Sequence, residues 1–235
     1  TSKTPINSSL NIDPKSSLTL SFDVIVKAGK GNILIKKSSD DSLIESIDIT
    51  SNSVSFNGKN VLINPNLELP QKTELYILIP LSAISDLTDN NWTGFFNKTD
   101  WTFTTNDITA PTLVGISPAD NTVDVSPESN LVVTLNEDIK KGTGNILIKK
   151  TSNDTIITAL DVASSQITIV DNVVTINPIS NLPSETEMYV EIPSTVFEDL
   201  YNNSFVGLSG TNSWSFTTAD ITNPTVTITS TVSNP

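Results

Sequence analysis

Short runs of apolar and β-branched residues recur between turn-forming residues throughout the second half of the chain. Several of them alternate apolar and polar positions, which is the pattern of a strand with one buried face. Strands are therefore predicted at residues 113–116, 130–135, 145–148, 155–160, 167–170, 173–176, 187–192 and 214–218. Strands of this length and spacing are typical of an all-β sandwich. A helical turn is expected in one place, at Ser194–Leu200.

The same pattern occurs twice along the chain. A shift of 113 residues, without a gap, moves Lys27–Lys37 onto Lys140–Lys150 and Trp101–Thr105 onto Trp214–Thr218. A repeat of this length indicates two tandem domains, each long enough to bury its own core. We expect immunoglobulin-like sandwiches at residues 1–106 and 107–219, followed by a linker and a further strand at residues 220–235.

The repeat is out of phase with the chain. The second unit opens with residues 107–116, but the first unit begins only at its counterpart of Val114, and a third copy of the opening segment starts at Asp220. The first sandwich is therefore expected to lack its opening strand, while the C-terminal segment carries a spare one. A sandwich without one strand exposes unpaired backbone groups, which is a strong liability for a lone domain.

The spare segment has the pattern of a strand. In residues 225–232, aliphatic side chains fall on one face and threonines on the other. We hypothesise that this segment completes the first domain of another copy and so builds a head-to-tail fibre. The candidate donor residues are Thr225, Val226, Thr227, Ile228, Thr229 and Val232.

Three alternatives for this segment stay open. A longer repeat protein cut out of phase would leave a frayed tail, and the tail could also fold back within its own chain. The Thr-x-Thr pattern of residues 225–229 is also compatible with a ladder that faces ice or a glycan, although an ordinary exposed strand face is the favoured explanation.

Glycines and aromatic residues have structural explanations. Gly29 and Gly31, with their copies Gly142 and Gly144, join two predicted strands and are expected to adopt positive φ in a hairpin or bulge. Large rings are expected in the cores at Trp101 and Trp214, with carbohydrate stacking as the alternative. The hydroxyls of Tyr76 and Tyr189 are expected to bond nearby backbone.

Composition narrows the function. The chain has 26 acidic residues against 13 basic ones, and its lysines are scattered, so nucleic acid is not an expected partner. No apolar run approaches the roughly 18 residues that would span a membrane. Cysteine and histidine are absent. Disulfides, thiolate zinc sites and Ser-His or Cys-His nucleophiles are therefore excluded, and no carboxylate pair suggests a glycosidase, so an enzyme is not expected.

Acidic residues near the ends of the units are candidate ligands for calcium, the one cofactor that the sequence suggests, because calcium is bound by about six to eight oxygen atoms. No EF-hand spacing is present, and Asx turns are the alternative explanation. The candidate ligands are Asp107, Asp120, Glu137, Asp138, Asp199 and Asp220.

Five motifs of the second unit carry a resemblance: Asp107–Pro111, Ile116–Asn121, Lys141–Ile146, Phe197–Leu200 and Trp214–Thr218. Together they resemble the bacterial Ig-like repeats of S-layer-type and large surface or adhesin proteins. The first unit departs from the pattern, with Phe22–Ile25 in place of Leu135–Asp138. The resemblance implies tandem immunoglobulin-like sandwiches, an extracellular or cell-surface location and no catalytic activity.

Together these features predict a structural subunit of an extracellular fibre or surface appendage. Its main partners would be copies of itself, with other surface proteins or glycans as further partners. The alternative is a spacer or carbohydrate-binding module excised from a larger secreted repeat protein or adhesin. An exposed aromatic platform would favour the alternative, and a tail ordered against another copy would favour the fibre.

Overall fold

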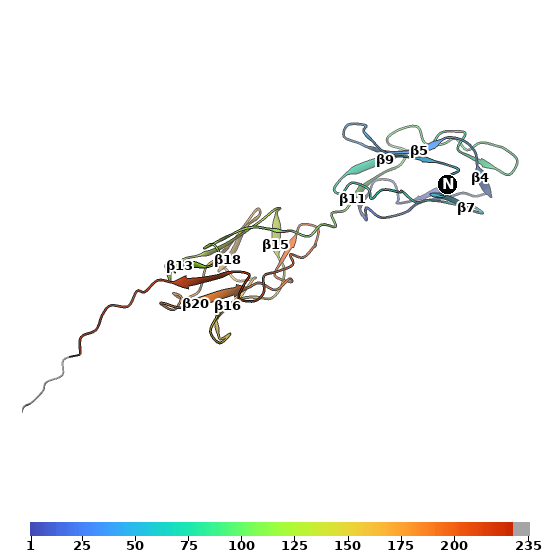
Figure 1. Cartoon of the computed structure of the whole chain (residues 1–235). Helices are drawn as coiled ribbons and strands as arrows, with labels where there is room; N and C mark the ends of the chain where they lie inside the picture. Colours follow the sequence, from blue (N-terminus) through green and yellow to red (C-terminus); the bar gives the residue numbers. More distant parts are fainter. Residues whose placement is uncertain (228–235) are drawn as a thin grey trace, which may run out of the picture. The chain divides into compact units, whose positions relative to one another are not determined.

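The computed structural model describes residues 1–227, which form β-strands and turns without a helix (Figure 1). No helix that could cross a membrane occurs in this range. The chain divides into two compact units, Thr1–Ile108 and Thr109–Pro235. Both units have the same all-β architecture, as the strand pattern predicted, and each is described below by itself.

The first unit contains a four-stranded sheet, a five-stranded sheet and a two-stranded ribbon. The four-stranded sheet has the order β1 (Ser2–Thr4), β3 (Leu18–Ser21), β8 (Asn60–Ile63), β7 (Val54–Asn57). The five-stranded sheet has the order β2 (Ser9–Ile12), β11 (Thr102–Thr105), β9 (Glu74–Leu78), β5 (Asn32–Lys37), β6 (Leu43–Asp48). The ribbon pairs β10 (Ile84–Asp86) with β4 (Val26–Ala28).

The second unit repeats this arrangement. Its four-stranded sheet has the order β12 (Leu113–Ser117), β14 (Leu131–Leu135), β19 (Val173–Ile176), β18 (Ile167–Val170). Its five-stranded sheet has the order β13 (Thr122–Val125), β22 (Ser215–Thr218), β20 (Glu187–Glu191), β16 (Asn145–Lys150), β17 (Ile156–Asp161). The ribbon pairs β15 (Ile139–Lys141) with β21 (Phe197–Asp199). The helical turn expected at Ser194–Leu200 is therefore wrong, because Phe197–Asp199 within this range form β21.

One strand pair in each unit is parallel. In the first unit β11 pairs with β2 in parallel, with Phe103 opposite Ser9. In the second unit β22 pairs with β13 in the same way, with Phe216 opposite Thr122. The other strand pairs of the described sheets are antiparallel. Each unit thus holds an early strand alongside its last one.

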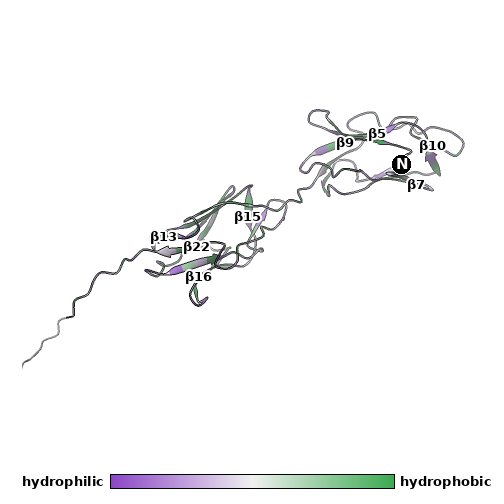
Figure 2. Ribbon diagram, in the orientation of Figure 1, coloured by the Kyte–Doolittle hydropathy of each residue, from purple (hydrophilic) through white to green (hydrophobic). Residues whose placement is uncertain are grey.

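Side-chain alternation builds the core of each unit (Figure 2). Leu18 and Leu20 of β3, like Ile33 and Ile35 of β5, are completely buried, while the residues between them are partly exposed. Because successive side chains of a strand point to opposite faces, one face of each strand supplies the core. Trp101 and Trp214 are also completely buried, which confirms that they belong to the two cores.

Two smaller expectations are corrected. The hydroxyl of Tyr76 donates a hydrogen bond to the Asp41 carboxylate at 2.8 Å, and Tyr189 does the same to Asp154 at 2.8 Å, so neither bonds backbone. Positive φ occurs at Gly31 (119°) and Gly144 (111°), but not at the other two glycines of this turn. At Gly29 and Gly142 the reason for glycine is space, because a Cβ at either position overlaps a neighbouring main-chain carbonyl oxygen.

The opening strand of the first unit is present, contrary to the sequence expectation. Ser2, Lys3 and Thr4 form β1 and pair with Ser21, Leu20 and Thr19 of β3. The strand is shorter than its counterpart β12, which has five residues and begins its pairing at Leu113. The edge of β3 in the first sandwich is thus paired rather than open, because Ser2, Lys3 and Thr4 cover three of its four residues.

Candidate docking surface at the end of the first unit

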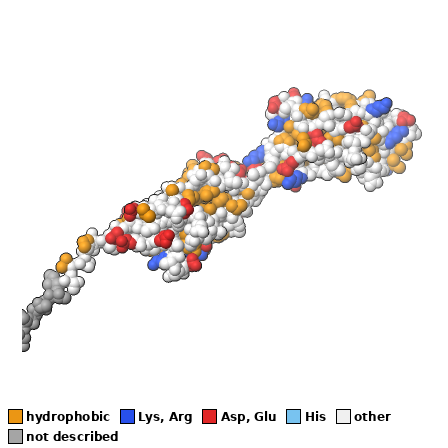
Figure 3. Space-filling model, viewed as in Figure 1, with side chains coloured by type: hydrophobic (Ala, Val, Ile, Leu, Met, Phe, Trp, Pro, Cys, Tyr) orange, Lys and Arg blue, Asp and Glu red, His pale blue; other side chains and the backbone are white. Residues whose placement is uncertain are grey.

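A hollow with an apolar lining lies at the end of the first unit where β3 leads into β4. We call it the leading-end hollow. Its volume is about 410 Å³, and it is lined by Asp23, Val24, Ile25, Lys59, Asp86, Leu87 and Thr88. Val24, Ile25 and Leu87 are 48%, 49% and 61% exposed. Hydrophobic side chains reach the surface of this unit near the end that carries β4 (Figures 1 and 3).

Backbone hydrogen bonds fix the segment that presents Val24 and Ile25. Phe22 N–H donates to the Lys59 carbonyl at 2.8 Å, and Val26 N–H donates to the Gly58 carbonyl at 3.0 Å. Lys59 Nζ donates to the Asp23 carbonyl at 2.7 Å. The residues before and after the two aliphatic side chains are therefore held to the β7–β8 turn, and this part of the lining is built in place.

The other side of the leading-end hollow is a loop organised by one carboxylate. Asp86 accepts hydrogen bonds from the backbone N–H groups of Thr88 at 2.8 Å and Asn90 at 2.9 Å, and from the Asn90 side-chain amide at 2.8 Å. These donors, with the Asn90 side chain first, lower the pKa of Asp86 to about 2. The loop that exposes Leu87 is thus pre-organised as well.

In the second unit, the matching strand end is covered by the opening strand. Thr112 N–H donates to the Asn136 side chain at 2.6 Å, Asn136 N–H returns a bond to the Thr112 carbonyl at 3.0 Å, and Leu113 pairs with Leu135. In the first unit, strand pairing stops at Ser2 and Ser21. Among the described residues of that unit, no strand pairs with Phe22 and Asp23 on this side.

The side chains at the two strand ends also differ. Glu137 and Asp138 of the second unit correspond to Val24 and Ile25 of the first. A carboxylate oxygen of Glu137 lies within 4.8 Å of one of Asp199. At these two positions the second unit therefore carries carboxylates where the first carries aliphatic side chains. The sequence had shown this difference only as a departure from the shared pattern.

A model of the bacterial Ig-like domain matches this sequence twice, at residues 1–105 and 107–218. The chain belongs to the bacterial Ig-like domain family. Among solved structures, the N-terminal part of the bacterial S-layer protein SbsC is similar at 14% identity and a TM-score of 0.29. The similarity covers 77% of this chain and 41% of that one, and is too weak to support an inference about fold or function. None of the curated proteins matches.

The segment that follows the second Ig-like domain is exposed as far as it is described. Ser184 Oγ accepts a hydrogen bond from Ile221 N–H at 3.0 Å, and the Asp220 carboxylate accepts one from Thr222 N–H at 2.8 Å. Beyond them, the donor candidates Thr225, Val226 and Thr227 form no strand, and Val226 is 86% exposed. The candidates Ile228, Thr229 and Val232 lie outside the described residues.

This exposure bears on the alternatives for the tail. The structure gives no support to a fold-back onto the tail's own domain, because residues 221–227 are all exposed. A donor strand that has not docked and a frayed tail would both be exposed in this way. Donation of the strand to another copy therefore stays a prediction.

The candidate calcium ligands are mostly engaged with hydrogen-bond donors. Asp120 accepts from Ser215 N–H at 2.7 Å, and the buried Asp199 accepts from Tyr201 N–H at 2.8 Å. Hydrogen bonds from Thr222 lower the pKa of Asp220, and the bond from the Thr222 side chain has the largest effect. The contacts of Asp199 and Asp220 with residues two positions further on are the Asx-type turns that were the alternative explanation, whereas Asp120 bonds the distant strand β22.

The remaining candidates have varied surroundings. Asp107, which falls in the first unit, is buried and forms an ion pair with Lys72. Glu137 is half-buried and close to Asp199, as described above, and Asp138 is exposed. Calcium at any of these residues stays a prediction.

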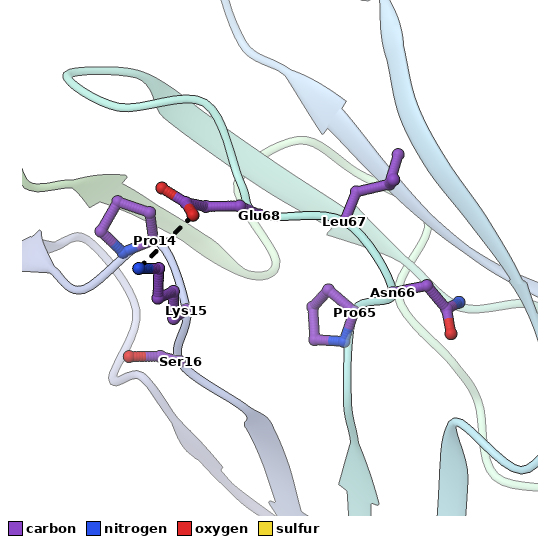
Figure 4. A pocket seen from close by; sticks show the side chains of 7 residues that line it. All are labelled: Pro14, Lys15, Ser16, Pro65, Asn66, Leu67 and Glu68. Carbon is purple, nitrogen blue, oxygen red and sulfur yellow. Dashed lines mark ion pairs between the residues drawn. The ribbon is translucent and has the colours of Figure 1, made fainter.

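A second hollow in the first Ig-like domain is polar and small. Pro14, Lys15 and Ser16 face Pro65–Glu68 across it, and Lys15 forms an ion pair with Glu68 at 3.6 Å (Figure 4). Its volume of about 150 Å³ is below the roughly 300 to 1,000 Å³ that is usual for small-molecule sites. This hollow is therefore too small to be a ligand site by itself.

The aromatic residues of the first domain do not form a flat platform. Trp92 meets Phe22 and Phe95 edge to face, with ring centroids 5.3 Å and 4.8 Å apart, and Phe95 in turn contacts Trp101 at 5.8 Å. Such edge-to-face rings pack against one another and against the core. Phe96 is the neighbouring ring that reaches the surface, at 60% exposure. This packing gives no support to the carbohydrate-binding alternative.

Proposed function

We propose that this protein is a non-catalytic structural subunit of an extracellular fibre or surface appendage, in which copies join head to tail. The bacterial Ig-like family and the tandem repeat support a surface structural role. The observation that carries the joint is the leading-end hollow, where apolar side chains and an unpaired strand end coincide. The segment starting at Asp220 repeats the one that covers the matching strand end of the second domain.

The internal repeat supplies the geometry of the joint. Thr225 and Val226 correspond to Thr112 and Leu113, which pair with Asn136 and Leu135 in the second domain. By the same register, Thr225 and Val226 of one copy pair with Asp23 and Phe22 of the next.

The energy of such a joint is adequate for a durable contact. Burying two or three aliphatic side chains contributes about 1.5 to 3 kcal/mol each. Each main-chain hydrogen bond adds about 1 kcal/mol net. The gross gain is on the order of 10 kcal/mol before the cost of ordering the tail and joining two molecules.

The direct experiment removes each half of the joint in turn. One variant ends after Asn223, and a second carries Val24→Glu with Ile25→Asp, which are the residues of the second domain at those positions. Leu43→Glu, at another residue that is 55% exposed, is the matched control. Electron microscopy and size measurements should show filaments for the wild type and the control only. If the chain that ends after Asn223 forms the same filaments, donation by the tail is wrong.

A spacer module of a longer repeat protein is the second candidate. The observation that favours it is the opening strand of the second domain, which already covers its strand end from within the same chain. In such an array, the repeat that precedes the first domain in the same polypeptide would cover the leading-end hollow. Purified protein that stays monomeric at high concentration, with or without its tail, would support the spacer and contradict the fibre.

A further inference from the structure

One sheet edge of the second domain lacks a protection that the matching edge of the first domain has. The five-stranded sheets end in β6 and β17, which are six residues long and pair on one side only within the described sheets. Such an edge presents unpaired N–H and C=O groups, to which another strand can add. Proteins commonly prevent this addition with charged side chains that point inward from the edge strand.

The edge strand β6 carries such an inward-pointing charge. Glu45 lies within it and is only 8% exposed. Its carboxylate accepts hydrogen bonds from Asn66 N–H at 3.0 Å and from Leu67 N–H at 3.4 Å. A second strand added to β6 would remove the remaining water from this carboxylate without supplying a new donor, which is costly for a buried charge. The edge of the first domain is therefore protected against pairing with another chain.

The edge strand β17 has no such charge. Thr158 takes the position of Glu45, and none of the residues 155–160 is charged. Four of the six are isoleucine or threonine, which favour strands, and Ile156 is 52% exposed. An exposed edge that is long, uncharged and rich in β-branched residues is suited to pairing with another strand.

The backbone of β17 shows where a partner strand would bond. Val162 N–H donates to the Gly144 carbonyl at 3.0 Å, and Leu160 lies opposite Ile146 of β16. Residues two apart in an antiparallel strand bond to the same neighbour, so Leu160 and Val162 both bond toward β16. Ala159 lies between them and turns its N–H and C=O away from β16. Because its side chain is small and exposed, it does not obstruct an approaching strand.

We propose that β17 is a pairing surface for a second copy of this chain, with two β17 strands adding to each other antiparallel about a twofold axis beside Ala159. The two Ala159 residues then exchange N–H···O=C hydrogen bonds. This register places Asp161 opposite Ile157 of the other copy, so the carboxylates of the two strands do not face each other. A twofold contact uses the same patch on both copies, and the uncharged run 155–160 is compatible with its own copy.

The pairing goes beyond the proposed head-to-tail joint and does not need it, since β17 and the leading-end hollow lie in different domains. A contact made by one edge strand is small, and interfaces below about 1,000 Å² are weak. We therefore expect an isolated chain to pair only at high protein concentration. Copies that are already joined in a fibre would repeat the contact, and multivalency would then strengthen it.

A single cysteine tests the register. The chain has no cysteine, so Ala159→Cys forms a disulfide only between two copies. Opposed Cα atoms of a hydrogen-bonded antiparallel pair are about 5.5 Å apart, which a disulfide can span. Ser46→Cys is the matched control, because Ser46 is the exposed counterpart of Ala159 in β6. Both variants also carry Val24→Glu with Ile25→Asp, so that the head-to-tail joint is blocked.

The two cysteine variants should differ in their rate of oxidation to dimers. Ala159→Cys should form disulfide-linked dimers about tenfold faster than Ser46→Cys or more, because pairing raises the effective concentration of the two thiols. Equal rates of dimer formation would contradict pairing through β17.

A charge at the same position should weaken the contact. Sedimentation equilibrium of the chain with the blocked joint should show dimers at high concentration, and Ala159→Lys should raise their dissociation constant about tenfold or more, because two like charges would meet at the axis. Ser46→Lys should leave it unchanged. A chain that stays monomeric at every concentration, or equal effects of the two lysine variants, would overturn the proposal. Absence of filaments from the unblocked chain would contradict the head-to-tail joint alone.

Discussion

The indole of Trp214 donates a hydrogen bond to the main-chain carbonyl of Pro118 at 2.8 Å. Trp101 makes the same bond to Pro5 at 2.9 Å in the first domain. Each bond ties the start of the last strand to the residue that follows the opening strand. Because the rings are completely buried, each bond is protected from water and closes its sandwich.

Removal of this bond should destabilise one domain selectively. Trp214→Phe leaves the Pro118 carbonyl without its donor and reduces the volume of a buried ring, so we expect the second domain to lose about 2 to 4 kcal/mol of unfolding free energy. Hydrogen exchange of the β22 amides during denaturant titration measures the loss. Trp92→Phe, at a half-buried ring, is the control. A loss below about 1 kcal/mol would show that the bond contributes little.

The buried carboxylate of Glu45 should be important for the turn after β8. It accepts hydrogen bonds from Asn66 N–H at 3.0 Å, from the Asn66 side-chain amide at 2.6 Å and from Leu67 N–H at 3.4 Å. Glu45→Ala leaves these donors unpaired, and should cost the first domain about 2 to 3 kcal/mol. Thermal unfolding measures the change, with Thr158→Ala at the same place in the second domain as control. Equal losses of stability in the two variants would contradict the role given to the Glu45 carboxylate.

The loop of Asp86 should respond to acid at unusually low pH. The pKa of Asp86 is lowered to about 2, whereas an unperturbed aspartate titrates near pH 3.9. A lowered pKa in the folded state stabilises the fold at neutral pH, and this contribution is lost as pH falls from about 4 to about 2. Carbon-detected NMR titration of the carboxyl should give the low value. A midpoint near 3.9 would mean that the loop bonds do not persist in solution.

Two glycines of the first domain should differ sharply in their tolerance of alanine. A methyl group at Gly29 overlaps the Ser82 carbonyl oxygen, so Gly29→Ala should cost about 3 kcal/mol or more. At Gly58 nothing lies within 4 Å, and the penalty comes from a φ of +62° alone. Gly58→Ala should therefore cost only about 1 to 2 kcal/mol. Denaturant unfolding of both variants measures the difference, and a milder effect at Gly29 would contradict it.

Most of the sheet structure follows from the local pattern. The strands expected at residues 167–170 and 173–176 have those bounds in the structure, and the others of the second unit agree within two residues. The strands that the pattern missed, β13, β15 and β21, have three or four residues each. Their pairing depends on contacts with distant segments, so a run this short gives no periodic signal of its own.

The docking surface was only partly visible in the sequence. The comparison of Phe22–Ile25 with Leu135–Asp138 marked the place where the two domains differ, but it did not show that Val24 and Ile25 line a hollow with Leu87. That grouping depends on the β4–β10 ribbon, which brings two loops together. The strand β1 was missed because it has only three residues, and so short a run shows no recognisable alternation of apolar and polar positions.

The parallel pairs β2–β11 and β13–β22 have a mechanical consequence for a molecule that works in a chain of domains. Parallel strands begin at the same end, so tension applied to the start of the early strand and to the finish of the last strand drags the two in opposite directions. The inter-strand bonds then resist the load together instead of opening one after another. Each sandwich is thereby suited to bear tension along its own length.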